Sequence, residues 1–177
     1  PGSSIKGVLR RAAEELSKES KDGWNPTAID FLFGHEDNTN ASRGTLTFWD
    51  AIPEVAGNTM GMDVMTPHYG DYYQGNATPH DAGSPNPIVF MVIPAKSKFT
   101  FHVTADTQRL KDVQNWQALM HIAFDHAFKW LGFGAKTAVG YGAMRRDHEA
   151  ETQALAELER LKEQEAEIKR QQEEAAL

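Results

Sequence analysis

The sequence contains no cysteine. That absence excludes disulfide bonds, thiolate metal sites and cysteine nucleophiles, and it is typical of a protein in a reducing compartment. No apolar run approaches the roughly 18 residues that a membrane span needs, and no signal peptide is visible. We therefore expect a cytoplasmic protein without a membrane segment.

Basic residues are too few to make the whole chain positive, since 18 Lys and Arg stand against 25 Asp and Glu. The excess of acid is concentrated at the C-terminal end: residues 147–177 hold ten acidic and four basic side chains, whereas residues 1–146 are close to neutral. Strong, sequence-independent binding of a nucleic-acid duplex is therefore disfavoured. Local basic spots in residues 1–146 remain compatible with binding a single anionic chain.

The length and composition predict one domain with an appendage. A chain of 177 residues with 40% apolar content is long enough to bury one sizeable core, which we assign to residues 1–146. Residues 147–177 contain no Gly or Pro and carry a thin apolar stripe, which predicts an acidic helical extension. This extension is either a solvated helix or a helix that docks on a partner.

Hydrophobic periodicity predicts the elements of the domain. The apolar spacing from Ile5 to Leu16 predicts a helix to about Ser20 with a serine N-cap. The later elements, in chain order, are a short apolar element at 28–34, a polar loop at 35–43, a strand at 45–49, a β-hairpin of 88–93 with 99–104, a second helix at roughly 107–131 and a strand near 141–145. The apolar stripe of the second helix, which we expect to be buried, consists of Trp116, Leu119, Met120, Ala123, Ala127, Trp130 and Leu131.

This order predicts an α+β fold of the ferredoxin-like, or RRM-like, type, with an antiparallel sheet and two helices. The β-α-β-β-α-β order requires a first strand, which we expect upstream of Pro1 because the first helix begins there. Residues 51–87 interrupt the domain with five prolines and five glycines. We expect this long irregular insertion to be functional, as long ordered loops commonly are.

A glycine-rich loop at 132–142 is the most informative motif. It holds four glycines and one lysine between the second helix and the last strand. Glycine lets the backbone approach a ligand closely and aims successive N–H groups at phosphate oxygens. The loop lacks Walker spacing, because Trp130 and Ala135 stand where that motif has glycine, and no G-x-G-x-x-G passes through it. ATP and NAD are therefore disfavoured, and no cofactor is expected.

Two lysines are the candidate phosphate contacts. Lys6 lies in the first turn of the first helix, where the N–H groups and the helix dipole favour an anion, and Arg10 adds a like charge on the same face. Lys136 is the single charge of the glycine loop. The competing interpretations are a solvated surface lysine for Lys6 and a merely structural turn around Lys136. Arg43, Arg145 and Arg146 would extend the set of basic residues that Lys6 and Lys136 begin, which we call the basic line.

Aromatic and histidine side chains leave two further possibilities open. Tyr69 and Tyr72 lie in an aromatic stretch of the insertion and would either stack on unpaired bases or pin the loop to the core. His35, followed by two acidic residues, and His68 together with His80 and its neighbour Asp81 could form an acid/base or metal site. His121 and His126 are five residues apart and lack the spacing of a helical metal site, so no metal is expected.

Three sequence blocks, in this order, resemble the RAMP superfamily of CRISPR systems. In chain order they are residues 1–10, a middle block made of Met65–Tyr69, Pro79–Asp81 and Ser84–Ile88, and the glycine loop 132–142. The middle block is similar to the subunit-six family of type III-B Cmr effector complexes. The resemblance covers about residues 1–146. It implies a ferredoxin-like RNA-binding core in a ribonucleoprotein of antiviral defence.

The resemblance also implies a role and partners. This chain would be a noncatalytic subunit that holds the 3′ side of the guide RNA, with target RNA cut in a different subunit. Its partners would be the guide and target RNA, the backbone RAMP subunit, a neighbouring capping RAMP subunit and the small subunit. The insertion 51–87 would be a thumb that separates guide from target. The predicted RNA-binding residues are Ser3, Ser4, Lys6, Arg10, Arg43, Tyr69, Gly134, Lys136, Thr137 and Gly140.

Two other functions remain open at this point. Relatives with the same glycine loop are metal-independent endoribonucleases that process CRISPR precursors, and His35, His68 or His80 would then be the acid/base residues. Alternatively, the chain is a protein–protein adaptor that acts through the helix at 148–177.

Overall fold

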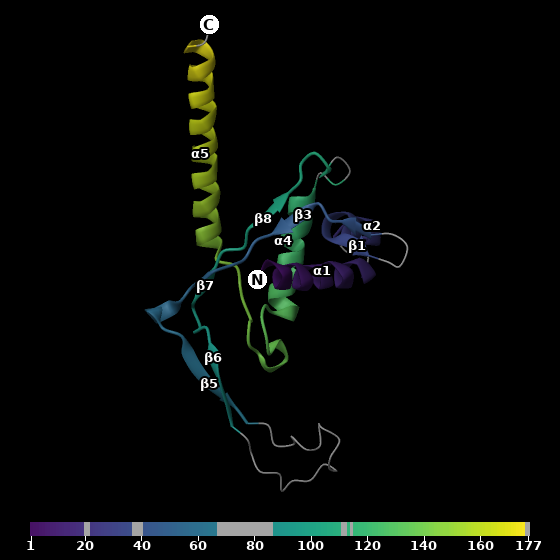
Figure 1. Ribbon diagram of the computed structural model, residues 1–177, viewed down its shortest axis with the longest axis vertical. Helices are drawn as coiled ribbons and strands as arrows, with labels where there is room; N and C mark the ends of the chain where they lie inside the picture. Colours follow the sequence, from purple (N-terminus) through teal and green to yellow (C-terminus); the bar gives the residue numbers. More distant parts are fainter. Residues whose placement is uncertain (20–21, 37–40, 67–86, 111–112, 114, 176–177) are drawn as a thin grey trace. The chain divides into compact units, whose positions relative to one another are not determined.

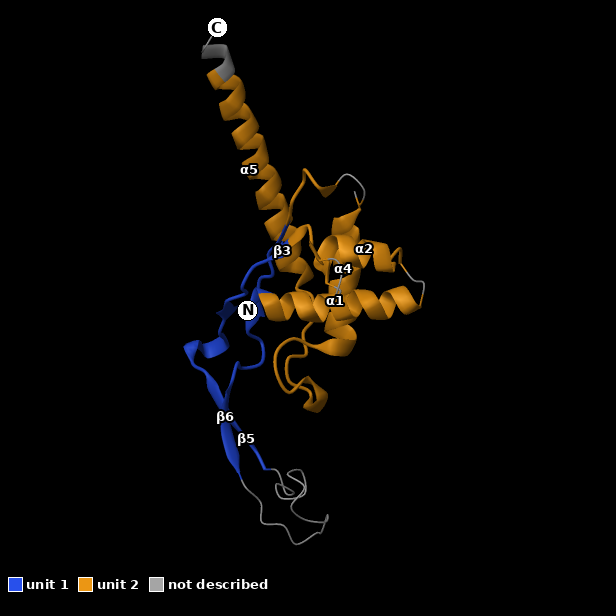
Figure 2. Cartoon of the chain, turned by 45° about the vertical axis from the view of Figure 1, so that its right-hand side comes forward, with its two compact units in different colours: residues 1–2, 47–104 blue, residues 3–46, 105–177 orange. Residues whose placement is uncertain are grey.

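A computed structural model describes all of residues 1–177 except 20–21, 37–40, 67–86, 111–112, 114 and 176–177 (Figure 1). In this described part the chain is mixed α+β, with four α-helices and four two-stranded sheets. It divides into two compact units, residues 1–2 with 47–104 and residues 3–46 with 105–177 (Figure 2). None of the helices described is both long and apolar enough to cross a membrane.

Helix α1 (Gly2–Lys18) confirms the predicted apolar spacing, because Ile5, Leu9, Ala12, Ala13 and Leu16 are all buried. The predicted serine N-cap is wrong, since Ser3 and Ser4 lie inside the helix. The amide of Gly2 donates instead to Asp50 Oδ1 at 2.6 Å, so a carboxylate distant in sequence satisfies the first N–H of the helix. A Cβ at Gly2 would lie 2.8 Å from the carbonyl carbon of Phe48, which explains the glycine.

The short apolar element is helix α2 (Pro26–Phe33). Asn25 is its N-cap, accepting from the Ala28 amide at 2.9 Å, and Pro26 occupies the first helical position. The predicted polar loop after it is wrong in part, because β1 (Gly34–Glu36) pairs antiparallel with β2 (Ala41–Arg43).

Three short ladders pair strands of residues 46–65 with strands of residues 88–105. They are β3 (Leu46–Phe48) with β8 (Val103–Ala105), β4 (Pro53–Glu54) with β7 (Lys98–Phe99), and β5 (Gly61–Met65) with β6 (Ile88–Val92). Glu54 pairs with Lys98 whereas Gly61 pairs with Val92, so the register shifts by one residue between the last two ladders. The 3-10 turn η1 (Ala56–Asn58) lies at this shift.

The predicted β-hairpin of 88–93 with 99–104 is therefore wrong in its pairing. Both segments contain strands, but their partners come from residues 46–65. Residues 51–66, assigned to an irregular insertion, supply two of these partner strands. The β-forming residues marked both strands correctly, but this pattern did not show which distant strands they pair with.

Helix α4 (Trp116–His126) begins about nine residues later than predicted and continues into a π-helical turn, η3 (Ala127–Leu131). Leu119, Met120, Ala123 and Ala127 are buried as the apolar stripe predicts. The strand predicted near 141–145 is wrong, because these residues have no strand partner in the described part of the chain. A four-stranded ferredoxin-like sheet is likewise not seen among the strands described.

Helix α5 (His148–Ala175) confirms the predicted C-terminal helix. Asp147 caps it, since its Oδ1 accepts from the Ala150 amide at 3.1 Å. The apolar stripe of this helix is solvent-exposed, at Leu155, Leu158, Leu161 and Ile168. Docking of this stripe on a partner stays a prediction.

Candidate nucleic-acid interface

The two ends of the glycine loop close on each other. The Phe133 amide donates to Gly142 O at 2.9 Å, and the Gly132 amide donates back to Ala127 O at 2.9 Å. Gly132 and Gly142 both have positive φ, and a Cβ on Gly142 would overlap the carbonyl of Phe133. Glycine is thus needed at the base of the loop for backbone contact, not for contact with a ligand.

Inside the loop, part of the backbone is occupied by its own turn. The 3-10 turn η4 (Thr137–Val139) follows Lys136, which has left-handed backbone angles of φ 61° and ψ 30°. The amides of Val139 and Tyr141 donate to Lys136 O, and the Gly140 amide donates to Thr137 O. Those three amides therefore do not face a ligand, so the second half of the loop does not supply the N–H groups that the glycines of 132–142 predicted for phosphate.

The first half of the loop is the part open to an anion. The amides of Gly134, Ala135 and Thr137 make no hydrogen bond to the backbone of the chain as described. Gly134 has φ 103°, no described residue comes within 4 Å of its missing Cβ, and Lys136 is exposed. Backbone N–H groups and a lysine on one turn are the donors that phosphate oxygens accept from. Contacts of Gly134, Lys136 and Thr137 with RNA stay predictions.

The predicted residues of α1 have different environments. Ser3 and Ser4 are exposed and Lys6 is half-buried. Arg10 is held by its neighbours: Nε bonds Glu14 at 2.9 Å, and Nη1 donates to Gly34 O at 2.7 Å. This side chain therefore ties α1 to the end of α2, and much of its hydrogen-bonding capacity is used within the protein.

Among the remaining predicted residues, Arg43 and His35 lie in the described part of the chain. Arg43 is exposed on β2, and its carbonyl accepts from Arg109 Nη2 at 2.9 Å. Tyr69, His68 and His80 lie outside the described residues. Of the histidines in the endoribonuclease hypothesis, His35 is described, with Nδ1 at 3.4 Å from Asp30 Oδ2. No group of three or more metal-binding side chains occurs in the described part of the chain.

Basic and acidic residues are concentrated in different segments of the chain, which the sequence motifs did not indicate. Residues 126–146, which include the glycine loop, contain four basic and no acidic side chains. Residues 44–95, which include the insertion, contain five acidic and no basic side chains. A polyanion is therefore attracted to the loop and repelled by the insertion.

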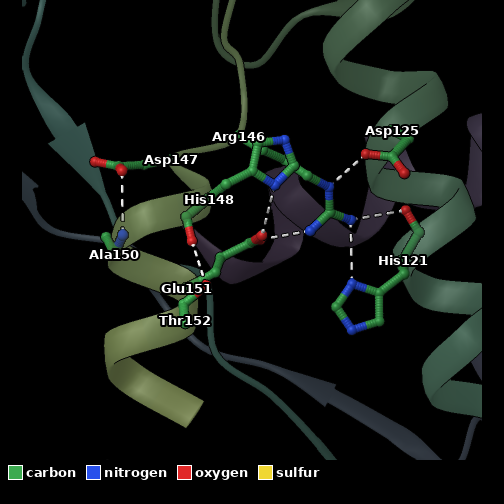
Figure 3. A network of polar contacts seen from close by, with 8 residues as sticks. All are labelled: His121, Asp125, Arg146, Asp147, His148, Ala150, Glu151 and Thr152. Atoms are coloured by element: carbon green, nitrogen blue, oxygen red, sulfur yellow. Dashed lines mark hydrogen bonds and ion pairs between the residues drawn. The ribbon is translucent and has the colours of Figure 1, made fainter. Parts of the chain in front are cut away.

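Arg146 joins the start of α5 to α4 through a network of polar contacts (Figure 3). Its guanidinium bonds the carboxylates of Asp125 and Glu151, and Nη2 lies 3.0 Å from His121 O and 3.1 Å from His121 Nδ1. The Arg146 side chain is only 13% exposed. Burial alone would lower the pKa of Arg146, but the two carboxylates outweigh it and raise this pKa above its ordinary value. Arg146 is thus a structural cation, although the sequence placed it on the basic line.

An open cleft of about 630 Å³ borders this network. Lys129 and Arg145, the exposed basic residues next in sequence to the loop, line it together with His121, Asp125 and His148. The two carboxylates in the cleft, of Asp125 and Glu151, are bonded to Arg146. The single charge of Arg146 offsets one of these two negative charges, and Lys129 and Arg145 add two positive ones, so the basic side chains of the cleft outnumber its carboxylates by three to two.

Glu15 links α1 to α4 and predicts a dependence of stability on pH. Its carboxylate lies 2.9 Å from His126 Nε2 and 3.0 Å from Arg11 Nε. The hydrogen bond with His126 lowers the pKa of Glu15, and Arg11 assists. A lowered folded-state pKa stabilises the fold above the ordinary glutamate value of about 4.3, and this contribution is lost as pH falls through the folded-state pKa.

We therefore expect Glu15→Gln to reduce the loss of unfolding free energy between pH 7 and pH 3, as measured by urea denaturation at each pH. Glu163→Gln on exposed α5 is the matched control and should parallel the unmodified chain. Identical pH profiles for Glu15→Gln and the unmodified chain would contradict this assignment.

Comparison with known proteins adds a family to this geometry. The model of the RAMP superfamily matches residues 1–145. A curated relative from Pyrococcus furiosus, described as "CRISPR system Cmr subunit Cmr6", is 34% identical over 114 residues, which cover 60% of this chain and 32% of the relative. The chain thus spans about a third of the length of that relative. Helix α5 lies beyond the residues that the family model matches.

Proposed function

Because the chain belongs to the RAMP superfamily, we propose that it is a noncatalytic RNA-binding subunit of a type III-B CRISPR (Cmr) ribonucleoprotein. In this proposal it holds the 3′ side of the guide RNA and contributes to assembly of the complex in antiviral defence. The similarity to the Cmr6 relative supports the choice of complex. The same proposal places the chain in the cytoplasm.

The observation that carries the RNA-binding role is the basic segment 126–146 folded into a closed loop. Its base is fixed by the Phe133–Gly142 hydrogen bond, and its exposed turn carries Lys136 beside the amides of Gly134, Ala135 and Thr137, which make no backbone hydrogen bond among the residues described. This arrangement binds phosphate through backbone and charge, without reading base edges. We expect affinity for single-stranded guide RNA with strong salt dependence and little sequence preference.

We also propose the ferredoxin-like arrangement for the domain 1–146. The chain order α1, β3, β8, α4 supports this proposal, because helix–strand–strand–helix is the middle part of the β-α-β-β-α-β order. Hydrogen bonds from Trp49 N to His102 O and from Asp106 N to Thr45 O flank β3 and β8 in antiparallel order. Residues 49–102 then form an insertion within the central hairpin.

That insertion would contact partners through apolar groups. On one face of the β5–β6 ladder, Met62 lies opposite Met91 and Val64 opposite Val89, and all four side chains are exposed. Since residues 44–95 have no Lys or Arg, phosphate binding by a thumb made of residues 51–87 is disfavoured. The proposed partners are the guide and target RNA, the backbone RAMP subunit, a capping RAMP subunit and the small subunit, with α5 as a further contact.

The phosphate contacts are tested by the double variant Lys6→Ala, Lys136→Ala. Each phosphate contact contributes about 0.7 to the slope of log affinity against log salt for a single strand, so the double variant should flatten the slope by about 1.4. The measurement is guide-RNA retention by the purified protein across a salt titration. Lys162→Ala, on exposed α5, is the control and should leave the slope unchanged.

An unchanged slope in the double variant would show that the phosphate roles of Lys6 and Lys136 are wrong.

The noncatalytic role has its own test, incubation with labelled repeat RNA in the presence and absence of a chelator. Specific cleavage that disappears in His35→Ala, His68→Ala or His80→Ala would replace this proposal with an endoribonuclease.

A further inference from the structure

Trp130 is exposed where its sequence predicts burial. It continues the apolar stripe of α4, three residues after buried Ala127, yet 68% of its surface is exposed, whereas Trp24 is 3% exposed. The π-helical turn η3 explains the difference: the Gly132 amide bonds Ala127 O five residues back, and this wider turn rotates Trp130 away from the stripe. Such turns occur often at functional sites.

A basic side chain lies against this ring. Lys129 Nζ lies over the Trp130 ring at 5.0 Å from its centroid. The same lysine lines the open cleft with Arg145, and Gly132, at the base of the glycine loop, is two residues further along the chain. An exposed aromatic ring beside basic side chains is the combination that holds single-stranded nucleic acid, because bases stack on the ring while cations meet the phosphates.

We propose that Trp130 is a base-stacking platform, on which one unpaired base of the RNA lies while Lys129 and Arg145 contact the flanking phosphates. This inference rests on the proposed RNA-binding function and adds a residue that neither the motif nor the resemblance indicated. It places base contact at the end of α4, independent of the tyrosines of the insertion.

A protein partner is the competing occupant of an exposed tryptophan. The charges favour RNA, because residues 126–146 carry no acidic side chain and the cleft that Lys129 lines has three basic side chains against two carboxylates. A stacked base needs only one open ring face, so the lysine already over Trp130 does not exclude it. Stacking tolerates every base, which agrees with binding that lacks sequence preference.

The test compares two ligands with the full chain. One is a single-stranded RNA oligonucleotide, and the other is an abasic ribose-phosphate oligomer of equal length. Trp130→Ala should weaken binding of the RNA by about tenfold and leave binding of the abasic oligomer unchanged, while Trp130→Phe should retain most of the RNA affinity. Trp49→Phe, a second exposed tryptophan, is the control and should match the unmodified chain.

The outcomes separate this inference from the proposed function. Salt-dependent binding of both ligands with no effect of Trp130→Ala overturns the stacking platform and leaves the RNA-binding role in place. Equal weakening of both ligands also overturns it, because the ring would then act through the phosphates. Unchanged RNA binding with failed assembly of the complex assigns Trp130 to a protein partner. Absence of binding by the unmodified chain overturns the proposed function itself.

Discussion

Replacing Gly142 by alanine is expected to lower the free energy of unfolding by about 3 kcal/mol, as overpacking adds to the strain of a left-handed residue. Gly142 has φ 70°, and a Cβ there would lie 2.8 Å from the carbonyl carbon of Phe133, with the oxygen closer still. The methyl group would thus break the hydrogen bond from Phe133 N that closes the loop. Urea denaturation followed by circular dichroism measures the change.

Gly134→Ala is the matched control for this substitution. Gly134 also has positive φ, at 103°, but no atom of the described residues lies within 4 Å of its missing Cβ. Its replacement should therefore cost only the backbone term, about 1 to 2 kcal/mol. Equal losses for Gly134→Ala and Gly142→Ala would show that backbone conformation alone, and not close approach across the base of the loop, explains the glycines.

Local patterns sufficed where a single periodicity decides the structure. The apolar spacing of α1 predicted which side chains are buried, because one face of a helix packs whatever its partners are. Helix α5 was predicted from composition alone, and β3 from its β-forming residues. In each case local preference and the environment in the fold agree.

The sequence did not show which residues far apart in the chain pair with each other. The strands at 88–92 and 98–99 were visible, but their pairing with 61–65 and 53–54 depends on residues far away in the chain. The first amide of α1 shows the same limit, since Asp50 satisfies it and neither nearby serine does. A strand at 141–145 was predicted from its residues, yet a strand also needs a neighbour to pair with.

The candidate site was predicted in outline and not in detail. The glycine loop with Lys136 was found by composition, but the structure separates Gly132 and Gly142, needed for close approach, from Gly134, which borders the open turn. Trp130 was assigned to the core because α-helical spacing places it there. The π-helical turn, which no residue pattern predicted, exposes Trp130.

Arg146→Met is expected to destabilise the protein by about 2 kcal/mol, because it removes charge-assisted hydrogen bonds to Asp125 and Glu151. The methionine keeps much of the side-chain volume, so the loss reports the guanidinium. Those contacts hold the first turn of α5 against α4, and we expect limited proteolysis near Asp147 to become faster. Denaturation and a protease time course measure both effects.

Arg160→Met is the control, since Arg160 pairs with Glu157 on the exposed surface of α5. It should cost less than 1 kcal/mol. A similar loss for Arg160→Met and Arg146→Met would mean that the network of Figure 3 adds nothing beyond a surface ion pair.

The same residue separates structural from RNA-binding cations at the end of the basic segment. Because the Arg146 guanidinium is bonded to two carboxylates, Arg146→Met should leave the salt dependence of RNA binding unchanged at temperatures where the variant is folded. Arg145→Met should flatten that dependence by about 0.7 in slope without a comparable loss of stability. The reverse result, a flattened slope for Arg146→Met alone, would show that RNA displaces Asp125 and Glu151 from Arg146 on binding.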